Sequence, residues 1–383
     1  MRPVDPRDRE PMRLHDTARG EVVPFEVGPV VTMYTCGITP YDATHLGHAA
    51  TYLTYDVLQR RLRDRGHDTR CVRNITDVDD DILRKARELG VHYLDLAAAE
   101  TARFDDDMRA LGMLPSWSEP RATSAIPDIR GFIGMVLDRG YAYQAGGGVY
   151  FDVSKFERFG QVSHLGRDEM LALAAERGGN VDDPHKDDPL DFVLWQPSAP
   201  GEPAWESLWG PGRPGWHIEC SALALRELGT TIDLHGGGTD LVFPHHECEA
   251  AQSEAATGER FVRHWLHQEM VRMDGEKMSK SLGNLVFVSD LRKVWDPRAI
   301  RLAVLAHHYR SGWEWSDELM PEAAERLAAW DAAGEGDGAL EEVRAALDND
   351  LDTPAALRAI DEAAASGVGV SKAAGLLGVT LER

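Results

Sequence analysis

A cysteine and two histidines lie close together in the segment "CGITPYDATHLGHAATY", residues 36–52. The segment joins an apolar stretch to a run with helical spacing, so it predicts a turn between a strand and a helix. His45 and His48, at positions i and i+3, would share one face of the first helical turn, where backbone N–H groups favour anions. Gly47 would let a nucleotide approach the backbone closely. The pattern alone is equally typical of histidines on an exposed helix start.

Two lysines occur in a second segment of interest, "DGEKMSKSLGN" at 274–284. Lys277 and Lys280 lie among small residues, with Gly275 and Gly283 on either side. A flexible loop of this kind can close over a triphosphate and neutralise the charge that grows in a transition state. A solvated basic loop is the simpler alternative for any pair of lysines.

The third set of residues has the composition of a zinc site. "GWHIEC" supplies Cys220, "FPHHECE" supplies His245 to Glu249, and the first segment supplies Cys36. Each such residue alone is more often part of a core than a ligand. His245 and Glu249 are a stronger indication, because residues at i and i+4 of a helix can face one ion. Spacing alone does not choose among the candidate ligands.

Alternating elements must position these residues. Residues 30–38 are typical of a buried strand, 46–65 of a helix, 68–80 of a strand with an acidic turn, and 81–90 of another helix. This order predicts a parallel α/β sheet. Residues 113–205 are rich in Pro, Gly and charge, which indicates an insertion, and the α/β pattern resumes at 230–246. A helical region follows residue 284.

Composition limits the classes of protein. A chain of 383 residues favours two or three domains, and four cysteines are too few for a disulfide framework. The net charge of −23 argues against a nucleic acid as the main partner. There is no run of about 18 apolar residues and no signal-peptide pattern in residues 1–16, so we expect a cytoplasmic protein without a membrane segment.

Five motifs carry a resemblance to a known family. "HLGH" and "KMSKS" resemble the HIGH and KMSKS elements of class I aminoacyl-tRNA synthetases. "CGITPYD", "NITDVDD", "GRPGWHIEC", "HGGGTDLVFPHHE" and "DGEKMSKSLGN" resemble the core of cysteinyl-tRNA synthetases. They resemble more closely the paralogous mycothiol-pathway cysteine ligases, which join cysteine to glucosaminyl-inositol.

The resemblance implies an α/β fold: a class I aminoacyl-tRNA-synthetase-like Rossmann nucleotidyltransferase core with an insertion and a C-terminal helical domain. The expected division is 1–112 for the first half of the catalytic domain, 113–205 for the connective insertion, 206–290 for the second half with the KMSKS loop, and 291–383 for the helical domain, with no anticodon-binding domain.

The resemblance also sorts the metal candidates. It implies one zinc ion per chain, held by Cys36, Cys220 and His245, with an open position for the substrate thiolate. Serine, whose hydroxyl is harder and less acidic, would then bind poorly. Glu249 stands where synthetases provide a fourth ligand, and both ligand sets remain open. Cys71 and Cys248 are expected to be packing residues.

The implied reaction has two steps, in which cysteine and ATP form cysteinyl-adenylate and pyrophosphate, and an acceptor then releases AMP. ATP is expected with Mg²⁺. His45, His48, Lys277 and Lys280 would stabilise the phosphates. The nucleotide and adenylate site would include Cys36, Gly37, Ile38, Thr39, Gly47, Thr51, Asn74, Ile75, Thr76, Trp216, Gly238, Thr239, Asp240 and Val271.

Three features favour the amino sugar as acceptor. "GITPYDATHLGHAATY" and "ERGGNVDDP" at 176–184 resemble the ligases, and the chain ends soon after "NDLDTPAALRAI". Glu249 and the form of "DGEKMSKSLGN" resemble the synthetases instead. The alternatives are therefore a cysteinyl-tRNA synthetase without an anticodon-binding domain, and a non-catalytic paralogue that binds cysteine or a nucleotide. We expect a monomer that uses L-cysteine, ATP and glucosaminyl-inositol, without tRNA.

Overall fold

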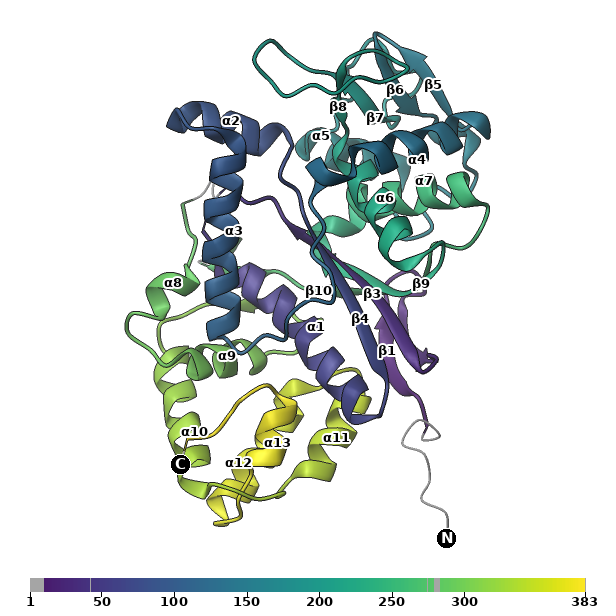
Figure 1. Ribbon diagram of the computed structural model, residues 1–383. Helices are drawn as coiled ribbons and strands as arrows, with labels where there is room; N and C mark the ends of the chain where they lie inside the picture. The colour runs from purple at the N-terminus through teal and green to yellow at the C-terminus, as the bar shows by residue number, and fades with distance from the viewer. Residues whose placement is uncertain (1–9, 42, 274, 279–282, 383) are drawn as a thin grey trace.

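The computed structural model describes residues 10–41, 43–273, 275–278 and 283–382 (Figure 1). Its centre is a parallel sheet of four strands in the order β10–β9–β3–β4. The strands are β3 (Val30–Ile38), β4 (Asp68–Ile75), β9 (Ile232–Gly238) and β10 (Val262–Gln268). The predicted parallel α/β core is confirmed, with the second predicted strand ending at Ile75.

Two helices make the connections between neighbouring strands of this sheet. Helix α1 (Leu46–Asp64) joins β3 to β4, and α7 (Glu247–Thr257) joins β9 to β10. Parallel strands need such crossovers, so the carboxyl ends of all four strands lie at one edge of the sheet. The motif residues that follow β3, β4 and β9 therefore meet at this edge.

The segment predicted as an insertion has its own secondary structure. Antiparallel strands β5 (Ala142–Ala145), β6 (Gly148–Phe151), β7 (Phe192–Pro197) and β8 (Gly212–Pro214) form a second sheet. The helices are η2 (Ala122–Ala125), α4 (Ile126–Asp138), η3 (Val153–Lys155) and α5 (Arg167–Glu176). Strand β8 comes after residue 205, so the sheet extends past the expected end of the insertion.

Helix α6 (Trp216–Leu228) follows β8 and packs against α4, α7, β3 and β4. Two short helices, η4 (Thr239–Leu241) and η5 (Val242–His246), connect β9 to α7. Helices α2 (Asp80–Leu89) and α3 (Tyr93–Ala110) follow β4. The second predicted helix is thus confirmed as α2.

The rest of the chain adds two small sheets and a group of helices. Strands β1 (Met12–Asp16) and β2 (Glu21–Phe25) form a hairpin, and β11 (Val271–Met273) pairs with β12 (Glu276–Lys277) and β13 (Trp313–Glu314). The C-terminal helices are α8 (Val288–Leu291), α9 (Pro297–Leu305), α10 (Leu319–Ala333), α11 (Leu340–Asp348), α12 (Thr353–Ala365) and α13 (Ser371–Leu376). In Figure 1, α1 lies between the central sheet and these helices.

The central sheet separates two hydrophobic cores. Val31 and Met33 of β3 belong to the core shared with α1 and the C-terminal helices, whereas Tyr34 and Cys36 belong to the core shared with α6 and α7. Successive side chains of a strand point to opposite faces. This alternation places the thiol of Cys36 under helices α6 and α7.

Candidate functional site

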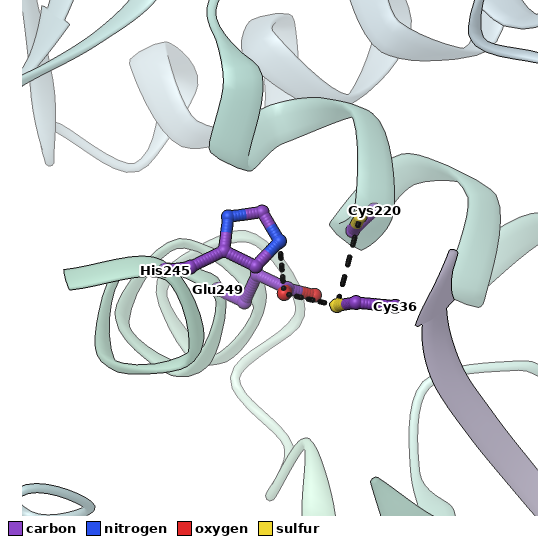
Figure 2. A group of neighbouring side chains, drawn as sticks. All are labelled: Cys36, Cys220, His245 and Glu249. Atoms are coloured by element: carbon purple, nitrogen blue, oxygen red, sulfur yellow. Dashed lines mark hydrogen bonds and ion pairs between the residues drawn. The ribbon is translucent and has the colours of Figure 1, made fainter. Parts of the chain in front are cut away.

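Four buried side chains from β3, α6, η5 and α7 meet at the carboxyl edge of the central sheet. Cys36 comes from β3, Cys220 from α6, and His245 and Glu249 from the turn and helix at the start of α7 (Figure 2). The structure places all four expected metal-binding residues together, Glu249 included.

The four ligand atoms lie within 4.8 Å of one another. The Cys36 Sγ atom is 3.9 Å from Cys220 Sγ and 3.4 Å from Glu249 Oε1, and His245 Nε2 is 3.0 Å from Glu249 Oε1. Two sulfur atoms, one imidazole and one carboxylate are a donor set that suits zinc. The residues present therefore fit a bound metal ion.

Electrostatics in this group favour a positive charge among the ligands. The hydrogen bond from Cys36 lowers the pKa of Cys220 to about 6, and burial raises the pKa of Cys36 well above its usual value. Burial would lower the pKa of His245, but Glu249 and the Cys220 thiolate outweigh it and raise the pKa to about 10. A bound metal would supply this positive charge in place of the imidazolium proton.

Two further histidines approach the same group: His246, one of the candidates in "FPHHECE", and His235, which sequence reasoning missed. His246 Nε2 is 3.3 Å from Cys36 Sγ, and His235 Nε2 is 3.0 Å from Glu249 Oε2. Together with Cys36 and Glu249 they form a second set with metal-ligand spacing. His235 precedes the glycines of "DLHGGG" and lies on the central strand β9, which ends at this edge of the sheet. Its position near the end of a predicted strand was the sequence signal that could have identified it.

A hydrogen-bonded chain leads away from the cysteines. His246 Nδ1 lies 2.6 Å from His267 Nε2, and His267 Nδ1 lies 2.7 Å from Thr17 Oγ1. These contacts hold the ring of His246 in one orientation, with its other nitrogen toward Cys36.

The predicted histidine pair stands at the start of α1. The rings of His45 and His48 stack with their centroids 3.8 Å apart, so the expected shared face is present. His45 caps the helix, and its Nδ1 accepts the N–H of Gly47 at 3.1 Å. A Cβ on Gly47 would come within 2.9 Å of that imidazole, so glycine leaves room for the cap.

The ends of β3 and β4 are joined by close backbone contacts. The Gly37 N–H donates to Asn74 Oδ1 at 2.8 Å, and Asn74 Nδ2 donates to Thr76 Oγ1 at 3.0 Å. A Cβ on Gly37 would be 1.5 Å from the Asn74 carbonyl oxygen. Ile38 and Ile75 are buried beside them, and the backbones at these two positions are paired. Gly37 is thus required for the approach of the two strands.

Thr39 contacts the next helix. Its hydroxyl donates to Asp79 Oδ2 at 3.2 Å, while Asp79 Oδ1 accepts the Ile82 N–H at 2.9 Å and caps α2. Burial raises the pKa of Asp79 to about 6, and Asp81 and Asp80 add to the effect. Asp79 is a residue near the site that sequence reasoning did not single out.

Several other expected pocket residues also lie at this edge of the sheet. Trp216 stacks on His245 with centroids 4.2 Å apart. Gly238 ends β9, and a Cβ there would meet the Asp240 carboxylate at 2.5 Å. The Thr239 hydroxyl donates to Glu269 Oε1 at 3.1 Å, and the side chain of Asp240 is exposed.

Three of the remaining expected residues lie in the part of the chain that the structure describes. Thr51 donates to the carbonyl of Gly47 at 3.1 Å, within α1. Val271 is buried in β11, and its carbonyl accepts from the Met278 N–H at 3.1 Å. Lys277 belongs to β12, next to that strand. Lys280 lies outside the described residues.

Comparison with known proteins adds to this geometry. Residues 23–325 match the family model described as "tRNA synthetases class I (C) catalytic domain". Two relatives, from Nocardiopsis dassonvillei and Streptomyces avermitilis, are each 51% identical to this chain. The aligned regions cover 92% of this chain and 88% of the first relative, and 95% and 91% for the second. Both carry the name L-cysteine:1D-myo-inositol 2-amino-2-deoxy-alpha-D-glucopyranoside ligase.

The chain belongs to this ligase family. It is an enzyme of the ligase class, built on the catalytic domain of class I synthetases. The family resemblance expected from the motifs is confirmed.

A solved structure supports the fold. The methionyl-tRNA synthetase of Mycobacterium tuberculosis, in complex with methionyl-adenylate, matches with a TM-score of 0.67. The match covers 88% of this chain and 82% of that protein, at 18% identity. The expected class I core with its C-terminal helical region is confirmed. Among the described residues, no helix combines the length and apolarity needed to cross a membrane.

Proposed function

We propose that this enzyme activates L-cysteine with ATP and transfers the cysteinyl group to the amine of glucosaminyl-inositol. The products would be Cys-GlcN-Ins, AMP and pyrophosphate, within mycothiol biosynthesis. The observation that supports this most directly is the group of Cys36, Cys220, His245 and Glu249, placed at the strand edge that also holds the stacked histidines. The names of the relatives support the same acceptor.

The metal that fits the group best is zinc. Cys36, Cys220 and His245 would hold it, with Glu249 as a fourth ligand or as the anchor of His245, which it contacts at 3.0 Å. Bound zinc would supply an open position for a thiolate, and a zinc site can expand to five ligands. A soft thiolate binds such a site far better than a hydroxyl, which supports selection of cysteine over serine.

The chain's own residues divide the remaining tasks. His45 and His48 would donate hydrogen bonds to the phosphates of ATP at the positive end of α1. Lys277 and Lys280 would add positive charge from the KMSKS loop, with Mg²⁺ accompanying ATP. The adenylate would lie against Gly37 to Thr39, Asn74 to Thr76, Trp216 and Gly238 to Asp240, with Asp240 at the ribose hydroxyls.

We also propose the expected domain division at 1–112, 113–205, 206–290 and 291–383, together with a monomeric enzyme in the cytoplasm. The insertion packs against α6 and α7 on one face of the central sheet, and the C-terminal helices pack against α1 on the other.

The experiment that tests the function measures cysteine-dependent AMP formation with ATP and one acceptor at a time. Turnover with glucosaminyl-inositol and none with tRNA is expected. Turnover with tRNA alone would replace the proposal with a synthetase activity. Absence of cysteine-dependent pyrophosphate exchange would indicate a protein that only binds its ligands.

A further inference from the structure

A buried carboxylate next to the metal-binding group has no partner among the described residues. Glu219 is 0% exposed, and neither of its carboxylate oxygens has a hydrogen-bond partner among the residues that the structure describes. A buried charged group without a partner is costly, so a native structure normally supplies one. For Glu219, a bound ligand can be that partner.

The position of Glu219 on α6 directs it toward the site. Trp216, Glu219 and Cys220 stand at i, i+3 and i+4, so they share one face of the helix. Trp216 stacks on His245, and Cys220 is 3.9 Å from Cys36. Glu219 therefore lies on the face of α6 that both of these contacts identify as the site.

The charges around Glu219 favour a cation. Burial raises the pKa of Glu219 well above its usual value, and the neighbouring charges of Asp79, Cys220 and Asp77 add to this effect. Asp77 already accepts two hydrogen bonds from Thr123. Arg213 is the opposing charge, but its guanidinium pairs with Asp80 and Glu202. A positive group beside Glu219 would relieve this repulsion.

The proposed substrate contains one group that none of the proposed metal- and nucleotide-binding residues would bind. L-Cysteine has a thiol for the metal-binding group, a carboxylate that must reach ATP, and an α-ammonium group. We propose that Glu219 binds the α-ammonium group of L-cysteine through a charge-assisted hydrogen bond. The inference rests on the proposed cysteine activation. The amine of the sugar is the weaker candidate, because it must lose its proton before it attacks, and an anionic partner opposes that loss.

The test compares L-cysteine with 3-mercaptopropionate, which has the same thiol and carboxylate and no amine. In Glu219→Gln, kcat/KM for cysteine in pyrophosphate exchange should fall about 10- to 100-fold, as expected for a charge-assisted hydrogen bond. The values for 3-mercaptopropionate should stay unchanged. Glu227→Gln, the same substitution at the C-terminal end of α6, where Glu227 is half-buried and pairs with Arg226, should behave like the unmodified enzyme.

Equilibrium binding keeps the test independent of turnover. Calorimetry of both compounds should give a weaker Kd for cysteine alone in Glu219→Gln, whereas Glu219→Asp, which keeps the charge, should lose less. If the unmodified enzyme shows no exchange, the proposed function fails, and these Kd values still decide the role of Glu219.

Five results would overturn the inference, and the first four concern cysteine and the metal. They are an unchanged Kd for cysteine, an equal loss for both compounds, no binding of cysteine by the unmodified enzyme, and a loss of metal content in Glu219→Gln. The last would show that Glu219 acts through Cys220. A rise only in KM for glucosaminyl-inositol would also overturn it, and would assign Glu219 to the acceptor amine.

Discussion

Cys36 and Cys220 differ in their environments although they touch each other. Cys36 lies on a strand between two helices, and its pKa is raised by burial, whereas the pKa of Cys220 is lowered to about 6 by the hydrogen bond from Cys36. Cys220 therefore loses its proton at a lower pH than Cys36. Its thiolate, with Glu249 nearby, can bind a cation while Cys36 is still protonated. This arrangement favours metal binding at neutral pH.

Replacing one of the proposed ligands should remove the proposed zinc ion. In Cys220→Ser, we expect zinc affinity to fall at least about 10- to 100-fold, together with cysteine-dependent exchange. Metal content by mass spectrometry after dialysis measures this. Cys71→Ala, a buried cysteine of β4 outside the cluster, should keep its zinc. Retention of metal in Cys220→Ser would contradict the assignment.

Gly37 permits the contact between β3 and β4 at the site. A Cβ there would be 1.5 Å from a backbone oxygen, so Gly37→Ala should lower the free energy of unfolding by at least about 2 kcal/mol and reduce exchange activity. Urea unfolding measures the first effect. Gly131→Ala, in α4 with nothing within 4 Å, should be neutral or stabilising by up to about 1 kcal/mol. Equal midpoints for the two variants would refute the argument.

At the scale of the elements, helix α2 begins at a cluster of acidic side chains. Asp79 caps it, Asp80 and Asp81 follow, and Glu219 of α6 adds a further like charge. Thr39 and Ile82 donate to Asp79, but burial outweighs them and raises its pKa to about 6 from the ordinary 3.8. The folded state therefore binds this proton more tightly than the unfolded state.

This difference sets the sign of a pH dependence. The contribution of Asp79 to stability is fully present below pH 3.8 and is lost as the pH rises through about 6. Asp79→Asn keeps a capping side chain and removes the titration. Its stability relative to the unmodified enzyme should rise between pH 4 and 7, by on the order of 2 kcal/mol. Urea unfolding across this range measures the difference, and a pH-independent difference would contradict the argument.

At the scale of the whole molecule, α1 connects the site to the C-terminal helices. The helix begins at the histidine pair, and further along it Arg61 donates to both oxygens of Asp348 in α11, at 2.9 and 2.7 Å. Asp64 accepts from Arg344 of α11. Within the core, Arg301 of α9 pairs with Asp56, and both side chains are fully buried. These contacts fix the helix that carries His45 and His48.

Breaking the buried pair should destabilise the whole fold. Arg301→Met removes the positive charge that pairs with the buried carboxylate of Asp56. It also removes the hydrogen bonds that Arg301 donates to the carbonyls of Leu111 and Leu377. We expect a loss of about 3–5 kcal/mol in the free energy of unfolding. Arg84→Ala, which removes exposed pairs on α2, should cost less than about 1 kcal/mol. Denaturant titration measures the free energy of unfolding of both variants. Similar losses in the two would contradict the larger contribution of the buried pair.

Much of the local structure was predictable because its signals are local. The apolar run at 30–38, the helical spacing after His45 and the strand at 232–238 all formed as expected. The hairpin β1–β2 was missed, because its two five-residue strands are short and Pro24 lies in the second. The sheet of the insertion was missed because its pairing joins strands far apart in the sequence: Val149 of β6 pairs with Trp195 of β7, and Trp195 pairs with Pro214 of β8.

The sequence by itself determined the types of chemistry, since the motifs contain thiols, imidazoles and lysines in a recognisable order. It left open which histidine of "PHHE" faces the cysteines, and it gave no indication of His235 as a neighbour of Glu249. Tertiary structure decided these points: the pleat of β3 turns Cys36 toward α6 and α7, and the parallel sheet brings β9 beside it. Side-chain direction depends on which faces pack together, and only the assembled layers define those faces.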